Sequence, residues 1–288
     1  MNICSSLKNK MTTRYECTLS PELLEKAVTE LHEPRDNAER LKAIDELRNS
    51  YNAEKYGPLI RDDDGFILRF LRAKKFNQKK ALTVLQNYHA IQKEFCELFI
   101  KVNNPIILQP LINSQVVLTL EGLAKDGASC LWVRMGLLDK NIDMYDLMAY
   151  SILVIEKLLE SEACQINGLR DIEDMENFNI GVILKISPFA LARMNSIWQD
   201  AMPLRFKSIH LLNEGKVYDV LFKLCKPFLK QKIIDRIHTH GSDVNGLHEF
   251  VDQAVLPPEL GGTGPDGEST GKWWIEKLTE DWTKDTAL

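Results

Sequence analysis

Hydrophobic residues in the first third of the chain recur at intervals of three and four, the spacing of helices that bury one face. The first such stretch follows Ser20-Pro21, and a serine before a proline favours a helix start. Further helix starts are predicted at Asp36, at the acidic run Asp62–Asp64 and at Asn77. Because short links join these segments, they predict a helical domain over residues 15–102, after a flexible N-terminus of residues 1–14.

Beyond Asn103-Asn104-Pro105 the pattern changes, because short apolar runs now alternate with helical stretches. This alternation predicts an α/β domain with a mostly parallel sheet over residues 103–264. Strands are predicted at 115–120, 130–135, 169–173, 208–212 and 237–240, and helices at 144–159, after Ser187-Pro188 and at 217–229. The stretch 261–270 is rich in glycine and polar residues and predicts a loop, within a C-terminal tail of residues 265–288.

The amino-acid composition is that of a globular protein without a membrane-spanning helix. Of the 288 residues, 44% are hydrophobic and 27% are charged, as in ordinary globular proteins. The longest apolar run, 147–155, is far shorter than the roughly 20 residues that a membrane-spanning helix needs. A net charge of -5 argues against general nucleic-acid binding. The 6 scattered cysteines favour a reducing interior, and we therefore expect a cytoplasmic protein.

No catalytic or metal-binding constellation is evident. The sequence at 262–267 matches G-x-G-x-x-G, but no strand precedes it and no βαβ unit can follow. His238 and His240 share a strand face without a third ligand nearby in sequence, so structural histidines are the better interpretation. We expect no catalytic residues, no metal and no cofactor. A lipid-modifying enzyme that uses Glu173 is the competing hypothesis, but no nucleophile–base pair supports it.

The segment from Lys216 to Arg236 allows two interpretations. Its apolar residues fall on one helical face and its lysines on another, and Pro227 should kink or end the helix. One interpretation is an ordinary core-facing helix with solvated lysines. The other is a hinged cover over an apolar interior, able to tip onto an anionic membrane.

Positive charge is concentrated in clusters, although the net charge is negative. Such clusters are commonly solvated faces, but focused charge also suits a surface that meets membrane phosphates. One cluster lies in the helical domain and another in the α/β domain: Arg69, Arg72, Lys74, Lys75, Lys79 and Lys80, and Arg205, Lys207, Lys232 and Arg236.

The predicted strand at 169–173 contains a conflict, because it reads Leu169-Arg170-Asp171-Ile172-Glu173. A central parallel strand is normally apolar throughout. Arg170 and Asp171 face opposite sides and cannot pair with each other. Either these charges have other partners or line a functional cavity, or the strand lies at an edge of the sheet.

Ordered sequence blocks resemble the CRAL-TRIO family of lipid-binding proteins over roughly residues 15 to 275, in the branch of retinaldehyde and tocopherol carriers. The blocks are Asp64–Phe76, Gln165–Gly168, Gln199-Asp200 with Pro203, His210–Glu214, Lys226–Leu229, His240-Gly241 and Leu256–Gly262. The resemblance implies a helical N-terminal domain beside an α/β domain with a buried pocket under a mobile lid helix. Asp171 departs from the family, which has an apolar or small residue there.

The resemblance also implies site residues. The expected ligand-pocket residues are Tyr150, Ser151, Glu173, Met194, Val220, Leu221 and Leu224. The expected phosphoinositide-binding residues are Lys74, Arg205, Lys207, Lys232 and Arg236. We therefore expect a non-enzymatic carrier that takes up a retinoid- or tocopherol-class lipid and exchanges it during transient contact with phosphoinositide membranes.

The alternative is a phosphoinositide-binding scaffold whose free C-terminus recruits a partner. The chain ends in a hydroxyl residue at the third-last position and an apolar residue at the carboxylate, a pattern that PDZ domains capture by strand addition. The residues concerned are Asp285, Thr286, Ala287 and Leu288.

Overall fold

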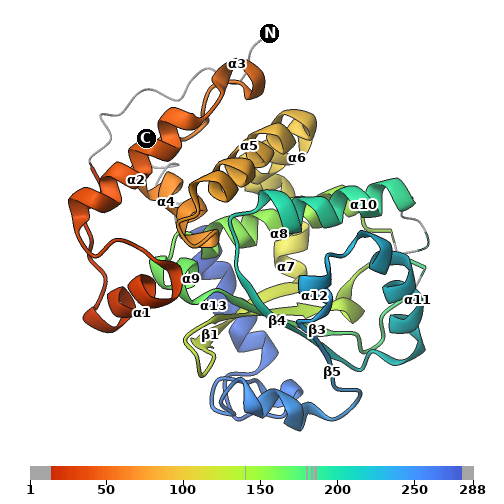
Figure 1. The fold of residues 1–288 in the computed structure, drawn as a ribbon. Helices are drawn as coiled ribbons and strands as arrows, with labels where there is room; N and C mark the ends of the chain where they lie inside the picture. The colour runs from red at the N-terminus through yellow and green to blue at the C-terminus, as the bar shows by residue number, and fades with distance from the viewer. Residues whose placement is uncertain (1–13, 140, 180, 183, 185–186, 281–288) are drawn as a thin grey trace.

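Helices form the first part of the molecule (Figure 1). The computed structural model describes residues 14–139, 141–179, 181–182, 184 and 187–280. The predicted starts are confirmed, because Ser20, Asp36, Asp63 and Asn77 each accept a hydrogen bond from a backbone N–H of the first turn. The helices are α1 (Pro21–Leu31), α2 (Asn37–Ser50), α3 (Ala53–Tyr56), α4 (Asp64–Ala73), α5 (Gln78–Glu94), α6 (Cys96–Asn103) and α7 (Gln109–Ser114).

A mixed sheet follows, with its 5 strands in the order β1-β2-β3-β4-β5. They are β1 (Val117–Leu123), β2 (Ser129–Arg134), β3 (Leu169–Asp174), β4 (Phe206–Leu212) and β5 (Ile237–Thr239). Only the β1–β2 pair is antiparallel, and the other three pairs are parallel. The expected mostly parallel sheet is confirmed. Because β3 lies at the centre of this order, the edge-strand interpretation of its charges is wrong.

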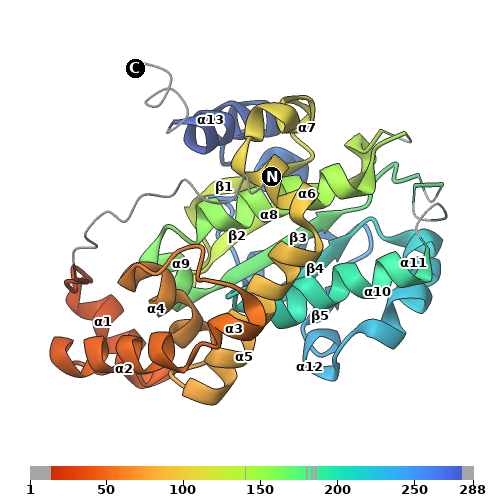
Figure 2. The ribbon, with the colours of Figure 1, turned by 90° about the horizontal axis from the view of Figure 1, so that it is seen from above.

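The helices between β2 and β5 lie mainly on one side of the sheet (Figure 1). They are α8 (Met144–Leu158), α9 (Glu162–Asn167), α10 (Pro188–Ser196), α11 (Gly215–Cys225) and α12 (Gln231–Ile234). Seen from above, α8 and α10 cross over the strands (Figure 2). The opposite face meets the segment after β5, where the Phe250 ring packs on His210 and His238. The strands are therefore buried between two layers.

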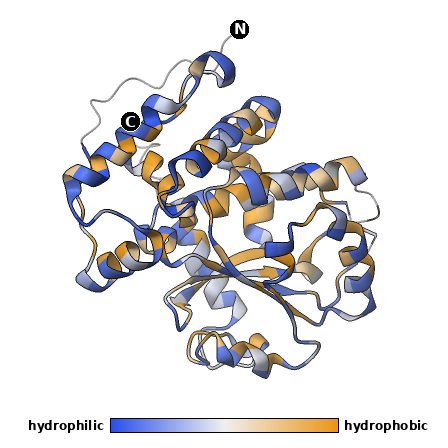
Figure 3. Ribbon diagram, in the orientation of Figure 1, coloured by the Kyte–Doolittle hydropathy of each residue, from blue (hydrophilic) through white to orange (hydrophobic). Residues whose placement is uncertain are grey.

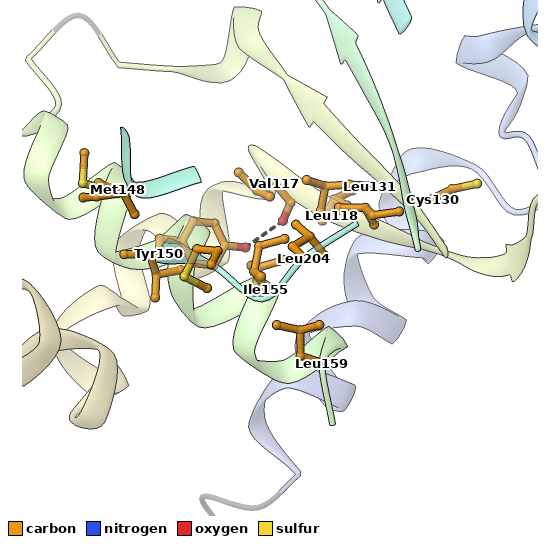
Figure 4. Close-up of a cluster of buried hydrophobic side chains, with 14 of the residues drawn as sticks. Val117, Leu118, Cys130, Leu131, Met148, Tyr150, Ile155, Leu159 and Leu204 are labelled. Carbon is orange, nitrogen blue, oxygen red and sulfur yellow. Dashed lines mark hydrogen bonds between the residues drawn. The ribbon is translucent and has the colours of Figure 1, made fainter. Parts of the chain in front are cut away.

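The core between α8 and the sheet is built from alternate strand residues (Figure 4). Leu131 of β2 belongs to the same buried cluster as α8 side chains such as Ile155. The ribbon in this region is mainly hydrophobic, whereas α2 on the outside is largely hydrophilic (Figure 3). Since Leu131 aligns with Asp171 and Ile209 across β2, β3 and β4, these two residues point toward the same helical layer.

The loop predicted for 261–270 is wrong from Gly267 onward. Helix α13 (Gly267–Thr279) begins there, and Asp266 caps it by accepting a hydrogen bond from the N–H of Ser269. Trp274 and Leu278 are buried one helical turn apart, and α13 packs on β1. The glycine-rich stretch before Gly267 favoured the prediction of a loop, because the helix is stabilised mainly by tertiary packing and not by its local sequence.

Candidate functional site

Helix α11 buries only part of its apolar face. It ends at Cys225 and passes into a tight 3-10 turn, Lys226–Phe228, which contains Pro227. The proline therefore ends the helix, as its missing N–H predicts. Val220 is 40% exposed and Leu224 is 39% exposed. Leu221 is half-buried and packs against the core, so α11 lies on the domain without being sealed into it.

The pocket residues expected on α8 form hydrogen bonds to the protein backbone. Tyr150 is fully buried, and its hydroxyl donates to the carbonyl oxygen of Val117 at 2.8 Å. The Ser151 hydroxyl donates to the Leu147 carbonyl oxygen at 2.9 Å. Both side chains thus have internal partners in this structure, and their contact with a ligand stays a prediction.

A pocket of about 390 Å³ lies between the start of α8 and α10. Its lining includes only one residue of the expected set, Met194, and consists of Phe95, Ile142, Asp143, Met144, Tyr145, Met148, Ser187, Phe189, Arg193 and Met194. Sequence reasoning missed the others. The available signal was the large apolar residue directly after each helix start, Tyr145 and Phe189, which remain 52% and 75% exposed.

Two carboxyl groups on β3, those of Asp171 and Glu173, face the helical layer. Asp171 is only 9% exposed, and its Oδ1 atom has no hydrogen-bond donor within reach. Within the described part of the chain, neither Asp171 nor Glu173 forms an ion pair. Burial raises the pKa of Glu173 to about 7. Burial, and secondly the charge of Glu173, raise the pKa of Asp171 well above its usual range.

Arg170, which directly precedes Asp171 on β3, has its partners on the opposite face of the sheet. Its guanidinium forms an ion pair with Asp126 at 3.0 Å and donates to the Ser208 hydroxyl at 2.7 Å. The charge of Arg170 in this central strand is therefore neutralised by an ion pair. Among the described residues, the two carboxyl groups have no such partner.

Basic residues from three elements converge at the start of β4. Burial lowers the pKa of Lys74, and the nearby charges of Lys232 and Lys230 lower it further. The pKa of Lys232 is lowered by burial and then by Arg236. Like charges shift each other's pKa in this way only at short range, so residues far apart in sequence share one surface. We call Lys74, Lys75, Lys80, Arg205, Lys232 and Arg236 the basic surface.

Most of the basic surface lacks acidic partners. Within the described residues, Lys74, Lys232 and Arg236 form no ion pair. Arg205 and Lys207 lie at its margin, because both approach Glu30 at 3.8 Å. The structure thus brings together the expected phosphoinositide-binding residues, with Lys207 the most neutralised by its neighbours Glu30 and Asp126.

Arg69 and Arg72, which the sequence grouped with the surface lysines, are internal. Arg72 is completely buried and forms ion pairs with Glu33 at 2.8 Å and Glu162 at 2.9 Å. Arg69 is 4% exposed and pairs with Glu156 at 2.9 Å. The solvated-face interpretation is wrong for these two residues, which instead attach α4 to the α/β domain.

The histidines on β4 and β5 have a structural arrangement. The rings of His210 and His238 stack with centroids 5.1 Å apart, and His210 Nδ1 lies 3.0 Å from His240 Nε2. Burial lowers the pKa of His210 to about 3, so its ring is neutral at physiological pH. In the part of the chain that the structure describes, no group of side chains is arranged to hold a metal ion.

Two expectations concern membranes and partners. Among the described helices, none combines the length and the apolar character that crossing a bilayer requires. Residues 285–288 lie outside the described residues, so the PDZ-ligand hypothesis stays a prediction.

Comparisons with known proteins agree with the fold. The CRAL/TRIO domain model matches residues 113–262, and the CRAL/TRIO N-terminal domain model matches residues 23–87. The alpha-tocopherol transfer protein-like protein of Mus musculus is 34% identical over 260 residues, which cover 90% of this chain and 75% of that protein. Clavesin-1 of Xenopus laevis is 33% identical over 264 residues, which cover 91% of this chain and 78% of clavesin-1.

A solved structure supports the architecture. The crystal structure of Sfh5 superposes with a TM-score of 0.51 at 14% identity, covering 94% of this chain and 99% of that chain, and shows the fold alone. The two family models and the two relatives confirm the resemblance drawn from the sequence blocks. The chain belongs to the CRAL-TRIO family, whose members bind and transfer lipids and are not enzymes.

Proposed function

We propose that the protein binds a small hydrophobic lipid of the retinoid or tocopherol class in its α/β domain and exchanges it at phosphoinositide-containing membranes. The observation that carries the proposal is the basic surface, where Lys74, Lys232 and Arg236 lie near one another and, among the described residues, form no ion pair. Cations held together raise one another's free energy until an anion joins them. Clustered phosphate groups supply several charged acceptor oxygens for such donors.

Helix α11 supports the exchange step. Each Å² of hydrocarbon removed from water is worth about 25 cal/mol, so a buried lipid leaves slowly into water. The half-exposed Val220 and Leu224 offer apolar contacts that a bilayer can take up when α11 moves. A membrane that binds the open form better than the closed form shifts the equilibrium toward release. Association with the membrane would then be peripheral and transient.

Two observations support the proposed class of ligand: the names of the relatives and the volume of the pocket. One group of relatives is named for tocopherol transfer. The pocket of about 390 Å³ beside α10 falls in the range of small-ligand sites, roughly 300–1,000 Å³. Its lining is mainly apolar and includes Met144, Met148 and Phe189. These features favour a hydrophobic ligand of modest size.

The test reverses charge on the basic surface. The double variant Lys232→Glu/Arg236→Glu should bind phosphatidylcholine vesicles containing phosphatidylinositol bisphosphate at least about tenfold more weakly, since each basic residue contributes about 1 kcal/mol near an anionic surface. Transfer of α-tocopherol or retinaldehyde to these vesicles should slow, while capture from detergent stays unchanged. The matched control is Lys272→Glu/Lys277→Glu on α13, which packs on β1 at the other end of the sheet order. Equal transfer by both variants would contradict the proposal.

A further inference from the structure

The carboxyl groups of Asp171 and Glu173 occupy an unusual position for a hydrophobic-lipid site. Both lie on β3, the central strand, and two residues apart, so they point to the same face of the sheet. Their neighbours across the strands on this face are Leu131, Val133, Ile209 and Leu211. No basic side chain occupies these neighbouring positions, so the pair lies in an apolar row.

Space remains above this row. Glu173 and its neighbour Val133 are only half-buried, and so is Ile209 beside Asp171, although all lie inside a sheet covered by helices. Residues in such a place keep accessible surface only where the covering layer leaves room. Asp171 is more than nine-tenths buried, yet its Oδ1 has no partner among the described residues. A buried polar atom without a hydrogen bond marks a place where a partner is missing.

Helix α11 lies over this place. Tyr218 and Leu221 of α11 pack against the buried core of this domain. Burial raises the pKa of Cys225 on the same helix, and the charge of Glu173 raises it further, so the Glu173 carboxyl group lies near α11. Arg170 cannot compensate, because it is bound to Asp126 and Ser208 on the opposite face. The segment proposed to move for lipid exchange therefore covers the unpartnered carboxyl groups.

We propose that Asp171 and Glu173 form the polar end of the lipid site and select ligands whose head group donates hydrogen bonds, a hydroxyl or a protonated amine, over ligands with a carboxylate or an acceptor-only head. The inference rests on the proposed lipid-carrier function and adds the head-group class. Ionised carboxyl groups only accept hydrogen bonds, and a half-protonated pair still offers more acceptors than donors. A donor head satisfies them, whereas a carboxylate head adds a further negative charge.

The experiment compares probes that share one hydrocarbon chain and differ only in the head: primary alcohol, primary amine, methyl ester and carboxylic acid. Binding to the full chain is measured by displacement of a fluorescent lipid at about pH 8, because burial raises the pKa of Glu173 to about 7 and this carboxyl group is mainly ionised there. We expect the alcohol and the amine to bind at least about tenfold more tightly than the methyl ester, since hydrogen bonds to charged groups are worth about that factor. The carboxylic acid should bind most weakly.

Variants separate the two donor heads. Asp171→Asn/Glu173→Gln removes the charge and keeps polar groups, so it should lose the preference for the amine and keep part of that for the alcohol. Asp171→Leu/Glu173→Leu should lose both preferences and still bind the methyl ester; if it does not fold, the amide variant alone carries the test. Glu121→Gln, an exposed carboxyl on β1, is the matched control and should behave as the wild type.

The outcomes are distinguishable. Equal affinity of the wild type for the ester and the donor heads would overturn the head-group inference and leave the carrier function intact. Binding of none of the four probes would overturn the carrier function and the inference with it. An unchanged preference in the leucine variant would also overturn the inference, because the selectivity would then lie elsewhere.

Discussion

Two regions of the molecule bury charged side chains, and they do so in opposite ways. Between the helical domain and α9, Arg72 meets Glu33 and Glu162, and Arg40 meets the same Glu33 at 2.7 Å. At the centre of the sheet, Asp171 and Glu173 have no such partners among the described residues. We call the first group, Arg40, Arg72, Glu33 and Glu162, the interdomain network, because its charges are paired with one another. The second group, Asp171 and Glu173, is the carboxyl pair.

The difference separates a structural role from a binding role. Buried charges are costly unless they are paired and hydrogen-bonded, and the interdomain network meets that condition within the chain. Within the described residues the carboxyl pair does not meet that condition, and the raised pKa of both groups reflects the cost of their burial. A protein that violates a packing rule at one place commonly does so at a functional site. We therefore regard the network as holding the domains and the pair as meeting the ligand.

The largest expected effect comes from opening the interdomain network. Arg72→Met leaves Glu162 without this guanidinium and Glu33 with Arg40 alone, and removing one partner of a buried ion pair costs about 3–5 kcal/mol. Urea denaturation should show a loss of that size in the free energy of unfolding.

The matched control for Arg72→Met is Arg35→Met. Arg35 pairs with Glu25, but its side chain is 59% exposed, and exposed pairs contribute about 1 kcal/mol or less. A loss of the same small size in both variants would show that the interdomain network is no more important than a surface pair.

The sequence could predict those features that depend on local patterns. Helix caps such as Ser20 and Asn77, the alternation of strands and helices after residue 103 and the helix end before Pro227 all follow from residues close together in the chain. Whether a side chain is buried could not be predicted in this way, because Arg72 and Lys74 lie two residues apart in one basic block, yet Arg72 is internal and Lys74 belongs to the basic surface.

The candidate site was predictable only in part for the same reason. Glu173 and Met194 were expected from the resemblance, but whether Asp171 faces the helices depends on which side of β3 each residue takes. The pocket beside α10 joins Phe95 to residues of α8 and α10 that are far apart in sequence. Such juxtapositions arise from tertiary packing, which no local pattern records.

A second effect, of on the order of 2 kcal/mol, is expected in the pH dependence of stability. The folded pKa of Glu173 is raised to about 7 and that of Asp171 is raised further, so the folded state holds protons that the unfolded state releases. Stability should therefore fall as the pH rises from about 4.5, near the unfolded carboxyl pKa, to about 8. In Asp171→Asn/Glu173→Gln this fall should be absent.

Other titrating groups do not obscure that comparison. Over the pair, burial raises the pKa of Cys225 to about 11 and also raises that of Tyr218, so neither titrates in this range. The buried His210 produces the opposite slope, since its pKa is lowered to about 3, but it does so equally in wild type and variant. Parallel stability curves for the two proteins would mean that the pair has partners.

The smallest expected effect sharpens the description of the interdomain network. The Tyr15 hydroxyl donates to Glu162 Oε1 at 2.6 Å and accepts from Arg72 Nη2 at 3.2 Å. Tyr15→Phe removes both bonds but leaves Glu162 paired with Arg72, so urea denaturation should show a loss of about 1 kcal/mol. In the background of Arg72→Met the same substitution should cost a different amount, because members of one network are not additive. Strict additivity would show that Tyr15 and Arg72 act separately, and that the network is a set of independent pairs.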